Sequence, residues 1–206
     1  MPPDDSKSQQ PSRSRPAPTA GEPATAGLAL IAAVSNRPAA NCQTASEIHI
    51  RPLGREDALC LWELLYQAIH VSPGAAPPAR EIVHSPELAH YAAGWGRPGD
   101  IGFLAVDAEA LLVGAAWLRL LTGDERGYGW VDDATPELSM AVMPAWRGQG
   151  IGTRLLAALW ETAAEHYAAV SLSVQADNPA VRLYRRQGFE VVEDGGAWYT
   201  MRKRLR

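Results

Sequence analysis

The feature that most constrains this chain is an apolar stretch, residues 137–143, that leads into a glycine-rich turn and then into an amphipathic helix. The turn contains Gly148, Gly150 and Gly152. Glycine has no side chain to keep a ligand away, and it tolerates the left-handed backbone angles that such turns need. The first N–H groups of a helix lack an intrahelical partner, and the helix dipole adds positive potential there. The pattern therefore predicts a strand, a turn and a helix whose main-chain amides converge on a phosphate or pyrophosphate.

Two other anion-binding glycine loops fit this segment poorly. A P-loop requires a Lys directly after its glycines, whereas Thr153 and Arg154 follow here. A dinucleotide fingerprint requires G-x-G-x-x-G, and counted from Gly148 the third glycine position is occupied by Thr153. Residues 143–147 also separate the strand from the glycines, whereas the dinucleotide turn is tight. A third pattern, R-x-x-G-x-G, does fit the turn.

A second motif, residues 177–189, follows the next predicted strand. Asn178 fits a helix N-cap, and Pro179 fits the first helical position, where its missing N–H costs no hydrogen bond. Gly188 fits the left-handed cap that ends a helix, and Phe189 begins another strand. The segment therefore predicts a short helix between two strands.

With these two motifs the chain resembles the GNAT family, the Gcn5-related N-acetyltransferases that use acetyl-CoA. Arg147, Gly150 and Gly152 match the family's R-x-x-G-x-G turn. The second motif resembles the family segment N-x-x-A-x-x-L-Y-x-x-x-G-F, which is matched at Ala180, Leu183, Tyr184, Gly188 and Phe189. The family's Asn would fall at Asp177, whereas the Asn of this chain is one residue later, at Asn178. The resemblance covers roughly residues 47–206.

The resemblance implies the GNAT fold, an α/β (α+β) architecture with a mixed central sheet of about six to seven strands and about four flanking helices. Hydrophobic periodicity predicts a compatible set of elements. The predicted strands are 47–53, 101–107, 110–121, 137–143, 170–174, 189–193 and 197–203. The predicted helices are 55–70, 79–93, the helix after the glycines and the helix of the second motif.

Residues 1–46 differ in composition from the rest of the chain. They contain seven of the 16 prolines and no aromatic residue. Such a stretch cannot bury enough apolar area to offset the entropy of ordering. The composition therefore predicts a disordered tail at 1–46, followed by a GNAT domain at 47–206.

Charge and apolar length exclude two classes of partner. The whole chain has a net charge of −4 and the tail carries +1, which leaves −5 on the domain. A nucleic-acid-binding domain is expected to have a basic face, so no nucleic-acid partner is expected. The apolar run 27–34 is too short to span a bilayer, so no membrane partner is expected either. Cys42 and Cys60 do not suggest a disulfide framework, and a cytoplasmic location is expected.

The resemblance further implies acetyl-CoA as cosubstrate and no metal. The turn and Arg147 would hold the pyrophosphate, the strand before it would offer main-chain groups to the acetyl and pantetheine portions, and Asn178 would contact the pantetheine arm. The predicted cofactor-binding residues are Met140, Ala141, Val142, Arg147, Gly148, Gln149, Gly150, Ile151, Gly152, Thr153, Asn178 and Tyr184.

Two side chains are predicted to be catalytic. Tyr184 is interpreted as the general acid, because a phenol titrates near pH 10 and a thiol near 8.5, so the phenol keeps a proton to share with the departing sulfur. The alternative is a core tyrosine. Glu137 is interpreted as the general base, because it opens the strand and shares a face with Ser139 and Ala141. The alternative is an ordinary glutamate at a strand end.

The long loop 122–135 is interpreted as a solvated loop without a binding role. The alternative is an acceptor site there, because its length is typical of functional loops and its net charge of −3 would suit a cationic amine. The leading hypothesis is transfer of the acetyl group to a primary amine of a small molecule or peptide, by direct attack in a ternary complex. A protein N-terminal or lysine acetyltransferase and a non-catalytic acetyl-CoA sensor are the alternatives. The amine is unidentified, and a homodimer is one expected assembly because many relatives are dimers.

Overall fold

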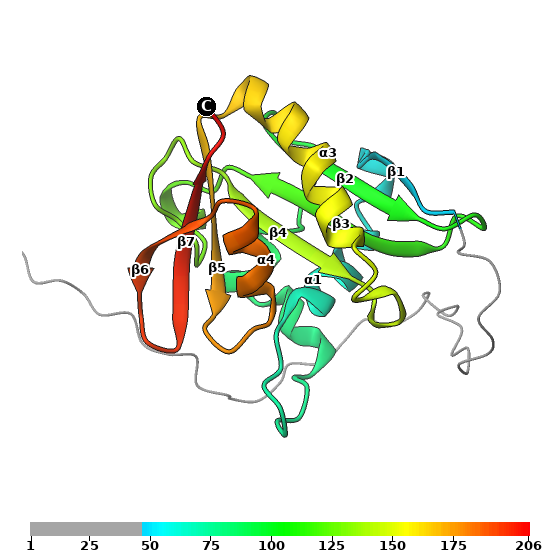
Figure 1. The fold of residues 1–206 in the computed structure, drawn as a ribbon, viewed down its shortest axis with the longest axis horizontal. Helices are drawn as coiled ribbons and strands as arrows, with labels where there is room; N and C mark the ends of the chain where they lie inside the picture. Colours follow the sequence, from blue (N-terminus) through cyan, green and yellow to red (C-terminus); the bar gives the residue numbers. More distant parts are fainter. Residues whose placement is uncertain (1–46) are drawn as a thin grey trace, which may run out of the picture. The chain divides into compact units, whose positions relative to one another are not determined.

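A computed structural model describes residues 47–206, which form a seven-stranded mixed sheet with helices on both faces (Figure 1). The strands are β1 (His49–Pro52), β2 (Ile101–Val106), β3 (Leu112–Arg119), β4 (Glu137–Val142), β5 (Ala169–Gln175), β6 (Glu190–Asp194) and β7 (Trp198–Arg204). The helices are α1 (Cys60–Ala68), α2 (Pro86–Ala89), α3 (Ile151–His166) and α4 (Ala180–Arg186). The predicted tail, with its apolar run and Cys42, lies outside the described residues.

The strand order is β1-β2-β3-β4-β5-β7-β6. Neighbouring strands are antiparallel except β4 and β5, which are parallel. The predicted mixed sheet, its number of strands and its four helices are confirmed. No helix within residues 47–206 combines the length and apolar character needed to cross a membrane.

Two predicted helices differ from the structure. The helix predicted at 55–70 is a 3-10 turn, η1 (Arg55–Asp57), followed by the shorter α1. The continuous helix predicted at 79–93 is wrong, because η2 (Arg80–His84) and the single turn of α2 are separated at Ser85, whose φ is −62° and ψ is 150°. Pro86 follows Ser85, and a proline ring disfavours the helical conformation in the residue before it.

Side chains of β3 alternate between two apolar cores. On one face, α3 buries Leu155, Leu156 and Leu159 against the sheet, and α4 joins the same core. On the other face, α1 packs against Trp117, which is fully buried. This alternation follows from the two-residue period of a strand. The first turn of α3 and the helix α1 therefore lie on opposite sides of β4 (Figure 1).

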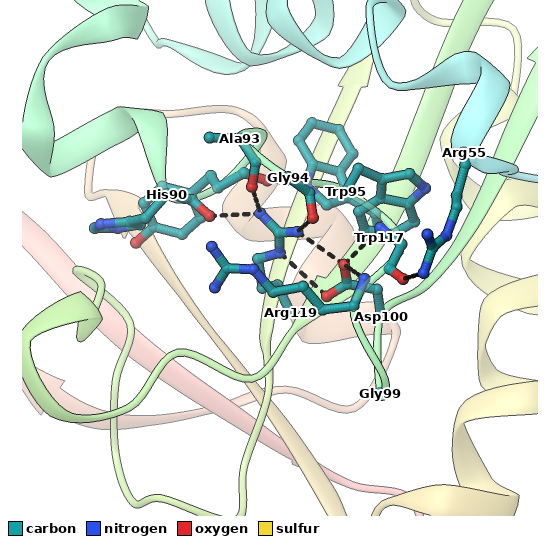
Figure 2. Close-up of polar contacts among 12 residues, drawn as sticks. Arg55, His90, Ala93, Gly94, Trp95, Gly99, Asp100, Trp117 and Arg119 are labelled. Atoms are coloured by element: carbon teal, nitrogen blue, oxygen red, sulfur yellow. Dashed lines mark hydrogen bonds and ion pairs between the residues drawn. The ribbon is translucent and has the colours of Figure 1, made fainter.

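A buried ion pair fixes the segment between α2 and β2 to the sheet. The Arg119 guanidinium is surrounded by the Asp100 carboxylate and three carbonyl groups, as Figure 2 shows. Nε and Nη2 donate to the two Asp100 oxygens at 3.1 and 2.8 Å. The remaining hydrogen bonds go to the carbonyl oxygens of His90 (2.8 Å), Ala93 (2.6 Å) and Gly94 (3.0 Å). All five guanidinium N–H groups have an acceptor, so the buried charge is fully satisfied.

The parallel pair β4–β5 is joined at one register position only, Glu137 opposite Ser171. Beyond it, β4 continues to pair with β3, while β5 pairs with β7. The sheet therefore separates along this line toward the carboxyl ends of the two strands, next to the glycine turn and α4 (Figure 1).

Candidate functional site

The glycine turn has the geometry of an anion cradle. Gly148 and Gly150 have φ angles of 75° and 78°, in the region that favours glycine, and Gly150 is the N-cap of α3. The first intrahelical hydrogen bond of α3 runs from the Arg154 N–H to the Gly150 carbonyl, at 3.2 Å. The N–H groups of residues 151–153 come before it and therefore have no partner within the helix. A Cβ placed on Gly148 or Gly150 would meet no atom within 4 Å, so both positions face open space. These features fit a pyrophosphate bound by main-chain N–H groups.

Three elements meet at the first turn of α3. A Cβ on Gly152 would lie 3.5 Å from Leu183 Cδ2 of α4 and 3.6 Å from Met140 Sδ of β4. The predicted phosphate turn, the predicted pantetheine strand and the helix that carries Tyr184 are therefore adjacent. The structure brings the two sequence motifs together at the point where β4 and β5 separate.

The main chain of β4 alternates between its two sides. The Met143 N–H donates to the Val113 carbonyl at 2.8 Å, so odd-numbered residues, Ala141 among them, direct their main-chain groups at β3. The Pro136 carbonyl accepts from the Ser171 N–H at 3.0 Å, which places even-numbered residues toward β5. Met140 and Val142 consequently present main-chain groups to the space between the separated strands. The main chain of Ala141 pairs with β3, and its predicted contact with the donor stays a prediction.

Arg147 connects the turn to the opposite face of the sheet. Its Nε donates to the Val142 carbonyl at 2.9 Å, and its Nη2 lies 3.3 Å from both the main-chain oxygen and the side-chain Oε1 of Gln67, in α1. The Gln149 amide donates to the Ala145 carbonyl at 3.2 Å within the turn. The arginine of the motif thus holds α1 against the end of β4, and its contact with a phosphate stays a prediction.

A second link ties the segment after α1 to the end of β5. The Ser72 hydroxyl donates to Asp177 Oδ2 at 2.7 Å, and His70 Nε2 lies 3.2 Å from Oδ1. The Ser72 hydrogen bond and then the nearby His70 hold the pKa of the Asp177 carboxyl below its usual value. Together with the Arg147 link, this contact makes residues 67–72 span the line along which β4 and β5 separate. We call this segment the strap.

Tyr184 is in α4 and its side chain is almost entirely buried. Its ring packs edge-on against Phe189, with the ring centroids 5.6 Å apart. Among residues 47–206, its hydroxyl has no hydrogen-bond partner, and burial raises the pKa of the phenol to about 12. The residue therefore keeps its proton at neutral pH.

Asn178 has the capping role predicted for it. Its Oδ1 accepts from the Ala180 N–H at 2.8 Å at the start of α4. Gly188 has the left-handed φ of 85° predicted after the helix. The contact of Asn178 with pantetheine stays a prediction.

Glu137 lies in a buried polar network. Only 2% of the residue is exposed. Its Oε2 accepts from the Tyr91 hydroxyl at 2.9 Å and from the Gly129 N–H at 2.8 Å. The Tyr91 oxygen in turn accepts from the Tyr128 N–H at 2.7 Å. Burial and then the Glu137 charge raise the pKa of Tyr91 well above its usual value, so Tyr91 is a hydrogen-bond donor at neutral pH.

The acidic loop 122–135 carries less free charge than its composition suggests. Three of its carboxylates form ion pairs: Glu125 with Arg97 at 2.6 Å, Asp133 with Arg126 at 3.3 Å and Asp132 with Arg202 at 3.5 Å. Because of these ion pairs, the three carboxylates do not present unpaired charge, and attraction of a cationic acceptor by the loop stays a prediction.

Within residues 47–206, no group of three or more His, Cys, Asp or Glu side chains is placed to hold a metal ion.

Residues 99–191, which include the glycine turn, β5 and α4, match the family model described as Acetyltransferase (GNAT) domain. Residues 99–191 are a GNAT acetyltransferase domain. The chain is 32% identical, over 111 residues, to a mycothiol acetyltransferase of Corynebacterium aurimucosum. That alignment covers 50% of this chain and 34% of the relative, so the match spans about a third of the relative's length.

Solved structures show the same fold as this GNAT domain. A GNAT acetyltransferase of Staphylococcus aureus Mu50 has a TM-score of 0.57 and 18% identity, covering 78% of this chain and all of that one. The yncA putative acetyltransferase of Salmonella typhimurium, solved with its cofactor acetyl-CoA, has a TM-score of 0.57 and 20% identity, covering 78% and 95%. The PaiA N-acetyltransferase of Thermoplasma acidophilum, in complex with coenzyme A, has a TM-score of 0.55 and 20% identity, covering 77% and 99%.

Several polar residues around the candidate site carry no signal in the sequence. Tyr91 and His70 belong to no motif, and each finds its partner more than forty residues away. Gly129 lies in the long loop 122–135, but nothing in the length or charge of that loop pointed to Glu137 as its partner. The pairings depend on the sheet register and on the path of the loop, which a single sequence does not specify.

Proposed function

We propose that the protein is an acetyl-CoA-dependent N-acetyltransferase that acts on a primary amine of a small molecule or peptide. The observation that carries the proposal is the separation of β4 from β5 beside an open glycine turn, with a buried tyrosine on the adjacent helix. The GNAT domain match and the Corynebacterium relative support the reaction class.

The donor would bind along the line where the strands separate. The amides of Gly148, Gly150 and the first turn of α3 would hold its pyrophosphate, as the open space above both glycines allows. The main-chain groups of Met140 and the N–H of Val142, whose carbonyl accepts from Arg147, would pair with the pantetheine arm and steady the oxyanion that forms when the amine attacks. The strap would cover the arm on the face opposite α3 and α4.

Tyr184 would stabilise the departing thiolate. Its pKa of about 12 lies above that of a thiol near 8.5, so complete proton transfer would cost about 5 kcal/mol. A charge-assisted hydrogen bond from the neutral phenol to the developing thiolate avoids that cost. We therefore assign Tyr184 as the donor of this hydrogen bond. The attacking nitrogen loses its second proton to solvent as the amide forms, and the released thiolate takes up a proton from solvent.

Glu137 would receive the proton of the substrate ammonium. The loop residue Gly129 covers its carboxylate, so transfer through an intervening water fits the burial better than direct contact. Attack in a ternary complex needs no covalent enzyme intermediate and therefore no nucleophilic side chain. Because acetyl-CoA is a cytosolic metabolite, a cytoplasmic location follows from this function, and a homodimer is the expected assembly.

The proposal is tested by mixing the full chain with acetyl-CoA and a panel of primary amines, and recording thiol release. We expect at least one amine to accelerate release in proportion to enzyme concentration. Calorimetry with coenzyme A provides the parallel binding measurement. Saturable binding without acceleration by any amine would favour the acetyl-CoA sensor, and absence of binding at millimolar coenzyme A would refute the proposal.

A further inference from the structure

The loop between β3 and β4 touches the sheet at two buried glycines. A Cβ on Gly129 would lie 2.6 Å from the main-chain carbon of Leu172 and 2.7 Å from the Ser173 nitrogen, both in β5. A Cβ on Gly127 would lie 2.5 and 2.6 Å from the two Glu137 carboxylate oxygens. No side chain fits at either position without moving backbone or a buried carboxylate. Residues 127–129 therefore lie directly over Glu137 and the middle of β5.

Between these glycines, the segment is held by Tyr91 as well as by Glu137. The Tyr91 oxygen accepts from Tyr128 N–H, and Glu137 accepts from Gly129 N–H, at 2.7 and 2.8 Å. Because Tyr91 also donates to Glu137 at 2.9 Å, a single hydroxyl joins the loop main chain to the carboxylate. These three hydrogen bonds form one chain, in which each group helps to orient its neighbours.

Tyr91 is itself rigidly mounted. Only 7% of the residue is exposed, and its carbonyl oxygen accepts from the indole Nε1 of Trp117 at 2.9 Å. The residue before it, His90, gives its carbonyl to the buried Arg119 guanidinium (Figure 2). The main chain that carries the Tyr91 ring is thus held by two side chains of β3. A group mounted in this way can set the position of a partner that lies at the start of β4.

We propose that Tyr91 is a positioning residue that orients the Glu137 carboxylate and seats loop residues 127–129 over it, so that base and acceptor loop form one unit. The proposal rests on the function proposed above, because Glu137 is there the proton acceptor. Tyr91 does not touch the donor in this scheme. It acts on the acceptor half of the reaction, through Glu137 and the loop.

Tyr91→Phe is the variant that tests the proposal, since it removes the hydroxyl and keeps the ring. The matched control is Tyr167→Phe, which removes a tyrosine hydroxyl that donates to the Gly99 carbonyl at 2.7 Å beyond the end of α3. We expect Tyr91→Phe to lower kcat about ten- to a hundredfold, the range expected for a misplaced catalytic group, with the KM for acetyl-CoA unchanged. The control should leave both parameters near those of the wild type. Equal effects of the two variants, or a loss confined to the KM for acetyl-CoA, would overturn the proposal.

Hydrogen exchange measured by mass spectrometry tests the same unit without any turnover. We expect the peptide that contains residues 127–129 to exchange about tenfold faster or more in Tyr91→Phe and in Glu137→Gln, and at the wild-type rate in Tyr167→Phe. Wild-type protection in Tyr91→Phe would show that the hydroxyl does not seat the loop. Exchange requires no substrate, so this measurement is independent of catalysis. If the protein acetylated no amine, the proposed function would be refuted, but the exchange rates would still decide whether Tyr91 seats the loop.

Discussion

The Arg119–Asp100 pair provides the sharpest stability prediction. The Asp100 carboxylate accepts two hydrogen bonds from Arg119 and two more from the main-chain N–H groups of Gly96 and Arg97, both at 2.9 Å. Asp100→Asn removes the charge and leaves the Arg119 cation buried without its counterion. Breaking a buried pair on one side costs about 3–5 kcal/mol. For a domain of this size the melting temperature should fall by roughly 6–20 °C, since each kcal/mol corresponds to about 2–4 °C.

Differential scanning calorimetry of the full chain measures this shift, and an exposed pair nearby supplies the control. Arg97 and Glu125 form an ion pair in which the side chains are 42% and 47% exposed. Exposed pairs contribute about 0–1 kcal/mol, so Glu125→Gln should lower the melting temperature by less than about 4 °C. If the two variants melted at the same temperature, the reasoning that burial makes Arg119 dependent on Asp100 would be wrong.

Three further predictions concern residues of the proposed donor site. Tyr184→Phe should lower kcat at least about tenfold while the KM for acetyl-CoA stays within about twofold, as steady-state kinetics will show. The pKa of the Tyr184 phenol is raised to about 12 in the folded protein, against about 10 in the unfolded chain. The free energy of unfolding of the wild type should therefore fall by about 3 kcal/mol between pH 10 and 12. Unfolding experiments at alkaline pH should show that the Phe variant lacks this loss. Gly150→Ala should weaken coenzyme A binding in calorimetry and destabilise the fold by about 1–2 kcal/mol, because a side chain at φ 78° is strained and projects into the cradle. The control Gly196→Ala, at φ 79° with equally open surroundings in the β6–β7 turn, should share the strain and bind coenzyme A normally.

Local sequence patterns were sufficient to predict most of the fold. The strand, turn and helix around Gly150 and the helix that ends at Gly188 depend on glycine conformation and capping, which are properties of neighbouring residues. The helix predicted at 79–93 was wrong because apolar spacing was weighed above Pro86, whose effect on Ser85 is equally local. That error could have been avoided from the sequence itself.

The polar contacts of the site could not be predicted in the same way. Glu137 was singled out by its place at the start of a strand, but its burial depends on Tyr91 and on the loop that returns over it. Arg147 was predicted as a cation beside the pyrophosphate, and its hydrogen bonds to Val142 and Gln67 arise only when α1 packs across β4. Such contacts are set by tertiary packing between segments distant in sequence. Whether the predicted residues bind acetyl-CoA stays a prediction.

The single ladder position between β4 and β5 has a consequence for how the protein would respond to its donor. A continuous sheet would satisfy the inner edges of both strands with each other, and no main-chain group there would be left for anything else. On the proposed function, the extended pantetheine arm of the thioester would take the place of the absent hydrogen bonds between β4 and β5 and connect the two halves of the sheet. Binding of the donor and completion of the sheet would then be one event, and the enzyme would be most rigid when acetyl-CoA is bound.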